Sequence, residues 1–131
     1  MVVPRFIGWA LKNEPIEIYG DGRQTRCFCC VFDVIRALEA LMKCPTAPGR
    51  VFNLGSDEEV TIEDLADRII RLSGSSSTKK FRSYEDVYGR PFDDMIRRVP
   101  DLKRICEAIG FTPAYSLDST LRMIIEDMQG K

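Results

Sequence analysis

The chain has 131 residues, of which 44% are apolar and 30% charged, an ordinary composition for a single globular domain. Its net charge of −1 provides no basic field that attracts phosphate backbones, which argues against a nucleic-acid-binding protein. The chain has no long apolar run and no basic N-terminal segment ahead of an apolar stretch, so neither a membrane span nor a secretory signal is expected.

The first quarter of the chain predicts a helix, a strand, a turn and a second strand. Pro4 suits the first turn of a helix, and apolar residues follow it at helical spacing. Residues 16–19 alternate as a short strand does, and the two glycines of residues 20–22 indicate a turn. The apolar run at residues 27–31 predicts a second strand.

The middle of the chain predicts two amphipathic helices around a short strand. We expect Asp33 to cap the first helix, whose inward stripe would consist of four apolar side chains. These are Val34, Leu38, Leu41 and Met42. Residues 51–54 are a candidate for a buried strand, and Thr61 with Asp64 resembles the capping box of a second helix. The stretch that begins at Gly74 is expected to end that helix.

The last third predicts one more strand and two more helices. Residues 79–83 suit a strand, and residues 84–96 have the weak periodicity of a loop. Asp101 and Ser116 are each placed to cap a helix, and Gly110 is placed to end the helix that follows Asp101. With about five helices and three or four short strands, the fold class is α/β or α+β. So few strands suggest that some of them complete a sheet whose other strands are missing here.

The stretch at residues 19–26 has the composition of a phosphate-binding turn. Two glycines allow the backbone to approach a ligand closely, and Arg23 and Arg26 offer forks of donors that suit phosphate. From the local sequence alone, a solvated hairpin turn with surface arginines is the favoured interpretation, because glycine-rich turns are common. The dinucleotide-binding fingerprint is excluded, because Thr25 stands where its third glycine belongs and a strand follows where it requires a helix.

A second basic stretch, residues 95–101, places Arg98 just before a helix start, where it can reach a phosphate or join a salt-bridged loop. The three clustered cysteines, Cys27, Cys29 and Cys30, point to different faces of a strand and are expected to be structural. Five cysteines, an odd number, favour reduced thiols and a cytoplasmic location. No histidine is present, so the chain offers no His-dependent catalytic pair and no His-containing zinc site.

Several motifs in order resemble one enzyme family. They are Val3-Pro4-Arg5-Phe6-Ile7, residues 15–33 with Tyr19-Gly20-Asp21-Gly22, residues 51–55, Arg98-Val99-Pro100-Asp101, and Ile109-Gly110-Phe111-x-Pro113. This order resembles the C-terminal part of the extended short-chain dehydrogenases/reductases that act on nucleotide sugars. UDP-glucose 4-epimerase, dTDP-glucose 4,6-dehydratase and UDP-glucuronate decarboxylase are members of that family.

The resemblance implies roles for four residues. Ile18 and Tyr19 would lie near the nucleobase, while Arg26 and Arg98 would bind the diphosphate of a nucleotide-diphosphate sugar, a UDP-sugar first of all. Asp33 matches a recurrent aspartate that is interpreted as a helix cap. The helix that begins near Pro4 would line the sugar site. In that family, NAD is held by a separate doubly wound domain.

Two departures from the family pattern limit what the chain is expected to do alone. It has neither the N-terminal G-x-x-G-x-x-G loop nor the catalytic Tyr-x-x-x-Lys motif. We therefore expect residues 1–131 to form a single sugar-nucleotide-binding domain, a fragment of a longer enzyme, inactive and without NAD when alone. A non-enzymatic binding or self-associating module derived from the same fold is the alternative, with homo-oligomers formed through the surface that the missing domain leaves open. An unrelated α/β domain with a coincidental turn is a third interpretation.

Overall fold

The computed structural model describes residues 1–89 and 95–130, which form six helices and four short strands. In chain order these are α1 (Val2–Leu11), β1 (Ile16–Tyr19), β2 (Thr25–Cys27), α2 (Val31–Lys43), β3 (Glu59–Thr61), α3 (Ile62–Ser73), β4 (Lys79–Arg82), α4 (Tyr84–Tyr88), α5 (Lys103–Ile109) and α6 (Leu117–Gln129). The described residues confirm an α/β class with few strands. None of these helices has the length and apolar character needed to cross a membrane.

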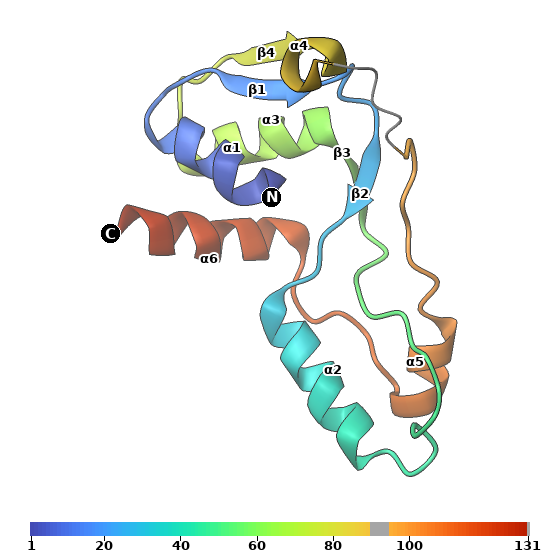
Figure 1. Ribbon diagram of the computed structural model, residues 1–131. Helices are drawn as coiled ribbons and strands as arrows, with labels where there is room; N and C mark the ends of the chain where they lie inside the picture. Colours follow the sequence, from blue (N-terminus) through green and yellow to red (C-terminus); the bar gives the residue numbers. More distant parts are fainter. Residues whose placement is uncertain (90–94, 131) are drawn as a thin grey trace.

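The main lobe packs α1, α3 and α6 together beneath the β1–β4 pair (Figure 1). Its core consists of apolar side chains from these helices and strands. The largest completely buried ones are Phe6, Ile7, Ile16, Ile18, Leu65, Ile69 and Leu121. The Thr61 hydroxyl accepts a bond from the Asp64 N–H at 3.0 Å, and Gly74 ends α3 with a φ of 63°. The caps predicted for this helix are therefore confirmed.

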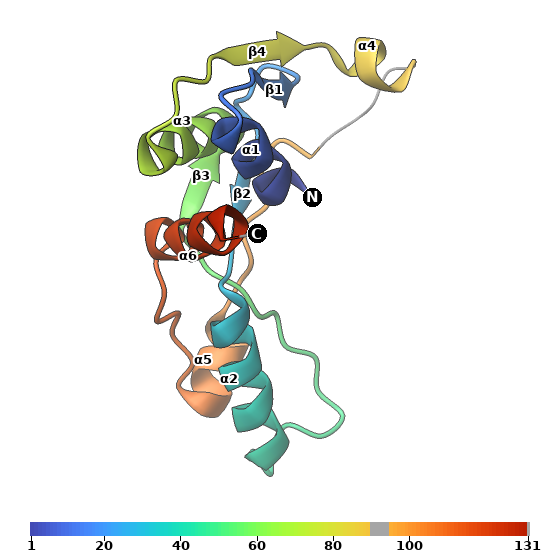
Figure 2. The same cartoon turned by 90° about the vertical axis from the view of Figure 1, so that its left-hand side faces the viewer.

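Two small sheets connect the elements. β1 and β4 are parallel, with Ile16 opposite Lys79, and β2 and β3 are antiparallel, with Thr25 opposite Thr61. A third extended segment joins the second sheet, because Thr25 also pairs in parallel with Arg97. The β2–β3 ribbon links the main lobe to a second lobe that extends away from it (Figures 1 and 2).

The second lobe consists of α2, α5 and the extended segments beside them (Figure 2). Among the described residues, its buried apolar core consists of Ala37, Ile105 and Phe111, surrounded by partly buried neighbours. Gly110 ends α5 with a φ of 64°, and Ser116 caps α6 by accepting from the Ser119 N–H at 3.2 Å. These two predicted helix boundaries are confirmed.

Asp33 corrects one sequence prediction. It lies inside the first turn of α2, which begins at Val31 after Cys30, so it is not the helix cap. Its carboxylate is completely buried and accepts bonds from the N–H groups of Ala114 and Tyr115 at 3.0 and 3.1 Å. The side chain therefore joins α2 to the chain that precedes α6, a contact between residues more than 80 positions apart.

Three further predictions differ from the structure. The strand expected at residues 27–31 lies earlier, at Thr25–Cys27, because β3 pairs with those residues. Residues 51–54 are extended but belong to no strand. Within the loop expected at 84–96, α4 forms under a Ser83 cap, and residues 90–94 lie outside the described part.

The stripe predicted for α2 is only half buried. Leu41 packs on the small core and Val34 is partly buried, but Leu38 is 51% exposed and Met42 is 88% exposed. The helix has apolar residues on more than one side, so its periodicity alone does not say which side is covered.

Candidate functional site

The glycine-rich turn after β1 is fixed by contacts that only glycine permits. Gly20 has a φ of 76°, and a Cβ there would lie 2.8 Å from the ring of Tyr84. The side chain of Gln24 closes the turn, donating to the Tyr19 carbonyl at 2.8 Å and to the Tyr84 hydroxyl at 3.2 Å. The turn is thus a rigid structure that holds the end of β1 next to the start of β2.

Tyr19 lies at the surface against two side chains of α1. The guanidinium of Arg5 is 4.5 Å from the centre of the Tyr19 ring and 5.2 Å from that of Trp9. It also donates to the Tyr19 hydroxyl at 3.2 Å. Such cation–π contacts fix the ring orientation. The sequence motifs did not indicate this role of Arg5. Its i,i+4 spacing to Trp9 on α1 is the feature of the sequence that could have indicated a contact between the two side chains.

Ile18 precedes Tyr19 but occupies a different environment. Its side chain is completely buried in the main core. It packs beneath the turn, since its Cγ2 would lie 3.2 Å from a Cβ placed on Gly22. Ile18 therefore supports the turn from below, and only its backbone is available to a ligand.

One face of the β2–β3 ribbon is occupied by a charged pair. Thr25 donates to Glu59 at 2.6 Å, and Arg97 donates to both oxygens of the same carboxylate at 3.0 Å. These bonds hold the pKa of Glu59 below its ordinary value and raise the pKa of Arg97. Arg97 is thereby neutralised by a partner within the protein.

The two predicted phosphate-binding arginines lie on adjoining extended segments. Each follows one partner of the parallel pair of Thr25 with Arg97. Arg26 is half-buried and donates to the carbonyls of Thr25 and Met95 at 2.7 and 2.8 Å. Arg98 is exposed and has no ion pair within residues 1–89 and 95–130. The fold thus places on adjoining segments two arginines that are 72 positions apart in the sequence, and Arg98 lines a cavity that Arg26 does not.

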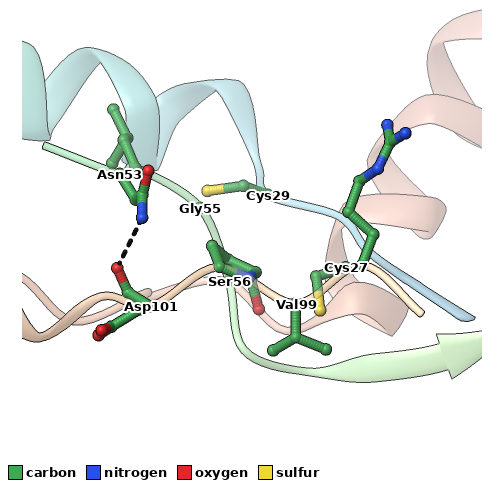
Figure 3. A pocket seen from close by; sticks show the side chains of 10 residues that line it. Cys27, Cys29, Asn53, Gly55, Ser56, Val99 and Asp101 are labelled. Atoms are coloured by element: carbon green, nitrogen blue, oxygen red, sulfur yellow. Dashed lines mark hydrogen bonds between the residues drawn. The ribbon is translucent and has the colours of Figure 1, made fainter. Parts of the chain in front are cut away.

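A cavity of about 600 Å³ opens beside Arg98. Figure 3 shows its lining, with Cys27 and Cys29 near the start of α2, Gly55 and Ser56 on the segment before β3, and Val99 on the segment after Arg97. The Asn53 amide donates to the Asp101 carbonyl at 3.1 Å and ties the two extended segments together at its far end. The cavity therefore lies between segments distant in the sequence.

The cysteines do not form a reactive or metal-binding centre. Burial raises the pKa of both the Cys27 and the Cys29 thiols, which keeps them protonated and weakly nucleophilic. Cys30 is buried on another side, at the start of α2. Within the described residues, no group of three or more potential ligands could hold a metal ion.

Comparison with known proteins identifies the family. Residues 1–124 match the family of GDP-mannose 4,6 dehydratases. The chain belongs to this family of NAD-dependent nucleotide-sugar epimerases and dehydratases. The resemblance inferred from the sequence motifs is thereby confirmed.

Curated relatives are decarboxylases of nucleotide sugars. The UDP-N-acetyl-alpha-D-glucosaminuronate decarboxylase of Bacillus cytotoxicus is 37% identical over 125 residues, which are 95% of this chain and 39% of that enzyme. UDP-glucuronic acid decarboxylase 2 of Arabidopsis thaliana is 33% identical, covering 98% of this chain and 27% of the relative. The chain thus spans well under half the length of these relatives.

Solved structures show the same fold. The epimerase Mth375 of Methanothermobacter thermautotrophicus superposes with a TM-score of 0.89 at 26% identity, over 99% of this chain and 37% of that one. The UDP-glucuronic acid 4-epimerase of Bacillus cereus, solved with UDP-glucuronic acid and NAD, gives a TM-score of 0.82 at 30% identity. That match covers 98% of this chain and 40% of the epimerase.

Proposed function

We propose that residues 1–131 are a single substrate-binding domain of an NAD-dependent nucleotide-sugar epimerase or dehydratase, and that its ligand is a UDP-sugar. The observation that carries this proposal is the placement of Arg26 and Arg98 on adjoining extended segments, each directly after one partner of the Thr25–Arg97 pair. Support comes from the Bacillus cereus epimerase, which was solved with UDP-glucuronic acid and NAD.

Four residues have proposed roles. The guanidinium groups of Arg26 and Arg98 bind the diphosphate, because a planar fork of donors matches phosphate oxygens in pairs. The ring of Tyr19, held by Arg5, lies against the nucleobase. Ile18 supplies its backbone and fixes the turn beneath that ring. Together these contacts orient the sugar for chemistry that other residues perform.

The residues present do not fit a bound NAD. The glycine-rich turn leads into β2, so it offers no helix N-terminus to a dinucleotide phosphate. The sequence also has no Tyr-x-x-x-Lys motif. We infer that the cofactor and the catalytic residues are supplied by another portion of the enzyme, and that this chain alone is inactive. Its free cysteines suit a cytoplasmic location.

Calorimetric titration with UDP and UDP-glucose tests the proposal. Arg26→Ala and Arg98→Ala should each weaken binding by about 1.5–3 kcal/mol, roughly 10- to 150-fold, because each removes hydrogen bonds to a charged group. Arg122→Ala is the matched control, since that exposed arginine lies on α6. Equal affinities in all four proteins, or no binding to the folded chain, would contradict the assigned site.

A second candidate function has one specific observation in its favour. The exposed apolar side chains of α2 suit a self-associating or non-enzymatic nucleotide-sugar-binding module. Such a module would form a defined homo-oligomer that binds UDP without any added partner. Light scattering of the purified chain separates the two, because a binding portion of a larger enzyme has no reason to form a defined dimer.

A further inference from the structure

Three segments that are distant in the sequence meet at the carboxylate of Glu59. Glu59 is the first residue of β3 and stands opposite Cys27 of β2 in the antiparallel ladder. Its carboxylate accepts a bond from the Thr25 hydroxyl of β2 at 2.6 Å and two bonds from the Arg97 guanidinium at 3.0 Å. The side chains of Thr25, Glu59 and Arg97 therefore join β2, β3 and the segment that contains Arg97, and we name these three residues the Glu59 clamp.

The backbone attaches the segment that contains Arg97 to the ribbon only lightly. Thr25 and Arg97 form an isolated parallel bridge, in which the Thr25 N–H donates to the Ile96 carbonyl at 2.8 Å. One backbone hydrogen bond does not offset the conformational entropy that a segment loses when it is ordered. The bonds of the clamp, together with the bond from Arg26 to the Met95 carbonyl, therefore provide much of the attachment.

Beyond the clamp, the same three segments form the walls of the cavity beside Arg98 (Figure 3). One wall comes from the chain around the end of β2, one from the chain before β3 and one from the chain after Arg97. Their lining residues are Cys27 and Cys29, Asn53 to Ser56, and Arg98 to Asp101. The Asn53 amide donates to the Asp101 carbonyl at 3.1 Å, so two of the walls are joined again away from the clamp.

The clamp fixes the chain directly before Arg98. The planar fork of Arg97 bonds both oxygens of one carboxylate, a geometry that fixes the direction of the side chain as well as its distance. Two residues after Arg98, Pro100 packs on Gly55, because a Cβ on Gly55 would lie 3.2 Å from the Pro100 Cγ. Arg98 therefore belongs to a short span that is held on both sides.

We propose that Glu59 and Arg97 are positioning residues, which hold the Arg98 guanidinium at the cavity by fixing its segment to the β2–β3 ribbon. The inference rests on the proposed function, because it concerns the orientation of one of the two arginines assigned to the diphosphate. Within the described part of the chain, neither Glu59 nor Arg97 lines the cavity. The bonds from Thr25 and Arg97 lower the pKa of Glu59, which keeps the carboxylate of the clamp ionised at neutral pH.

The charge of Glu59 makes this role distinguishable from a direct one. A carboxylate near a phosphate site repels an anionic ligand, so its removal should strengthen the binding of UDP if electrostatics alone decides. Its removal also releases the positive charge of Arg97, which would strengthen binding further if Arg97 were itself a phosphate ligand. A positioning role predicts the opposite sign, a weaker binding of UDP.

The experiment titrates the chain with UDP by calorimetry after circular dichroism has shown that each variant is folded. Glu59→Gln is the first test variant, because it keeps the shape of the side chain but turns one acceptor oxygen into an NH₂ group that cannot accept from Arg97. Arg97→Lys is the second, because it keeps the charge but loses the fork. Asp57→Asn is the matched control. Asp57 is exposed, and after burial its charge and that of Glu59 are what raise the pKa of the cavity-lining Cys27.

Both test variants should bind UDP about 3- to 30-fold more weakly than the wild-type chain, the range found for residues that act on a site without touching the ligand. Asp57→Asn should bind it as well as the wild type or slightly better. The double variant should be no weaker than the weaker single variant, because both substitutions break the same contact. Exchange of the Thr25 amide, which bonds the Ile96 carbonyl, should become at least about 3-fold faster in both test variants and not in Asp57→Asn.

Several results would overturn the inference. They are UDP binding by Glu59→Gln that is equal to or tighter than that of the wild type, exchange of the Thr25 amide that is unchanged in the test variants, and a loss of affinity in Asp57→Asn as large as in Glu59→Gln. If Glu59→Gln does not fold, Arg97→Lys decides by the same two measurements. A wild-type chain that binds UDP and test variants that bind it equally well refute the positioning role and leave the proposed function intact. A folded wild-type chain that does not bind UDP contradicts both.

Discussion

Replacement of Asp33 by alanine should destabilise the chain far more than a surface substitution does. The buried carboxylate accepts bonds from the N–H groups of Ala114 and Tyr115 and from Arg36 at 2.7 Å. Arg36 in turn donates to the Thr112 carbonyl at 2.7 Å. Alanine at position 33 leaves two backbone donors without an acceptor and releases Arg36, so the link between α2 and α6 loses its attachment.

The magnitude follows from the groups left unpaired. An unsatisfied buried donor costs about 1–3 kcal/mol, so the two donors of these part-buried hydrogen bonds give about 3 kcal/mol for Asp33→Ala. For a chain of this length that corresponds to a fall in melting temperature of roughly 10 °C. Glu39→Ala, which breaks only the exposed pair with Lys43, should shift the temperature by no more than roughly 2 °C.

Differential scanning calorimetry of the two variants and the wild type measures the effect, and near-ultraviolet circular dichroism reports whether the second lobe stays packed. A fall in melting temperature for Asp33→Ala no greater than that for Glu39→Ala would refute the reasoning. The buried carboxylate would then have no structural role despite its bonds.

The pH dependence of stability provides an independent check on Asp33. Burial raises the pKa of this carboxyl, but the bonds from Arg36, Ala114 and Tyr115 lower it further than burial raises it. The folded-state pKa therefore lies below the unfolded one. The stabilisation is complete above the ordinary carboxyl range and is lost as the pH falls through the folded-state value. Asp33→Asn should show a shallower loss of urea resistance than the wild type over that acid range.

The remaining predictions concern the turn and one ion network. Gly22→Ala should cost about 2–3 kcal/mol of stability, because the residue has a φ of 74° and its Cβ would lie 3.1–3.2 Å from three side chains. Gly49→Ala should cost about 1 kcal/mol, because Gly49 has a similar φ of 76° but open space around the added Cβ. Urea unfolding measures both, and equal losses would contradict the packing argument. Arg68 bonds three carboxylates, so Arg68→Ala should lose about 1–2 kcal/mol in the same assay. A loss no larger than for Lys43→Ala would show that the network contributes nothing.

Local signals predicted the helix ends because their partners are close in the sequence. Thr61, Ser116 and Gly110 each act on groups within four residues, so a short stretch of sequence contains the whole interaction. Asp33 bonds to a segment more than 80 residues away, and nothing near it in the sequence indicates that its carboxylate accepts hydrogen bonds from that segment. Aspartate is a common capping residue, which suggested a helix cap, but in the structure its carboxylate makes a tertiary contact instead.

In the candidate site, too, the sequence indicates some features and only the fold shows the others. The composition of residues 19–26 indicated a phosphate-binding turn, and the motif order indicated the family. The placement of Arg26 and Arg98 on adjoining segments, however, depends on the pairing of Thr25 with Arg97, which no local pattern contains. The contact of Arg5 with Tyr19 likewise depends on how α1 packs beside β1. Sequence identified the candidate residues, and only the fold shows which of them lie together.

The most direct test of the central claim compares UDP with UMP. If Arg26 and Arg98 bind a diphosphate, the wild-type chain should bind UDP more tightly than UMP, and the Arg26→Ala, Arg98→Ala double variant should bind the two nucleotides about equally. Calorimetry with each nucleotide measures the ratio, and circular dichroism confirms that the variant is folded. Equal binding of UDP and UMP by the wild-type chain, or a preference for UDP that survives the double substitution, would contradict the account.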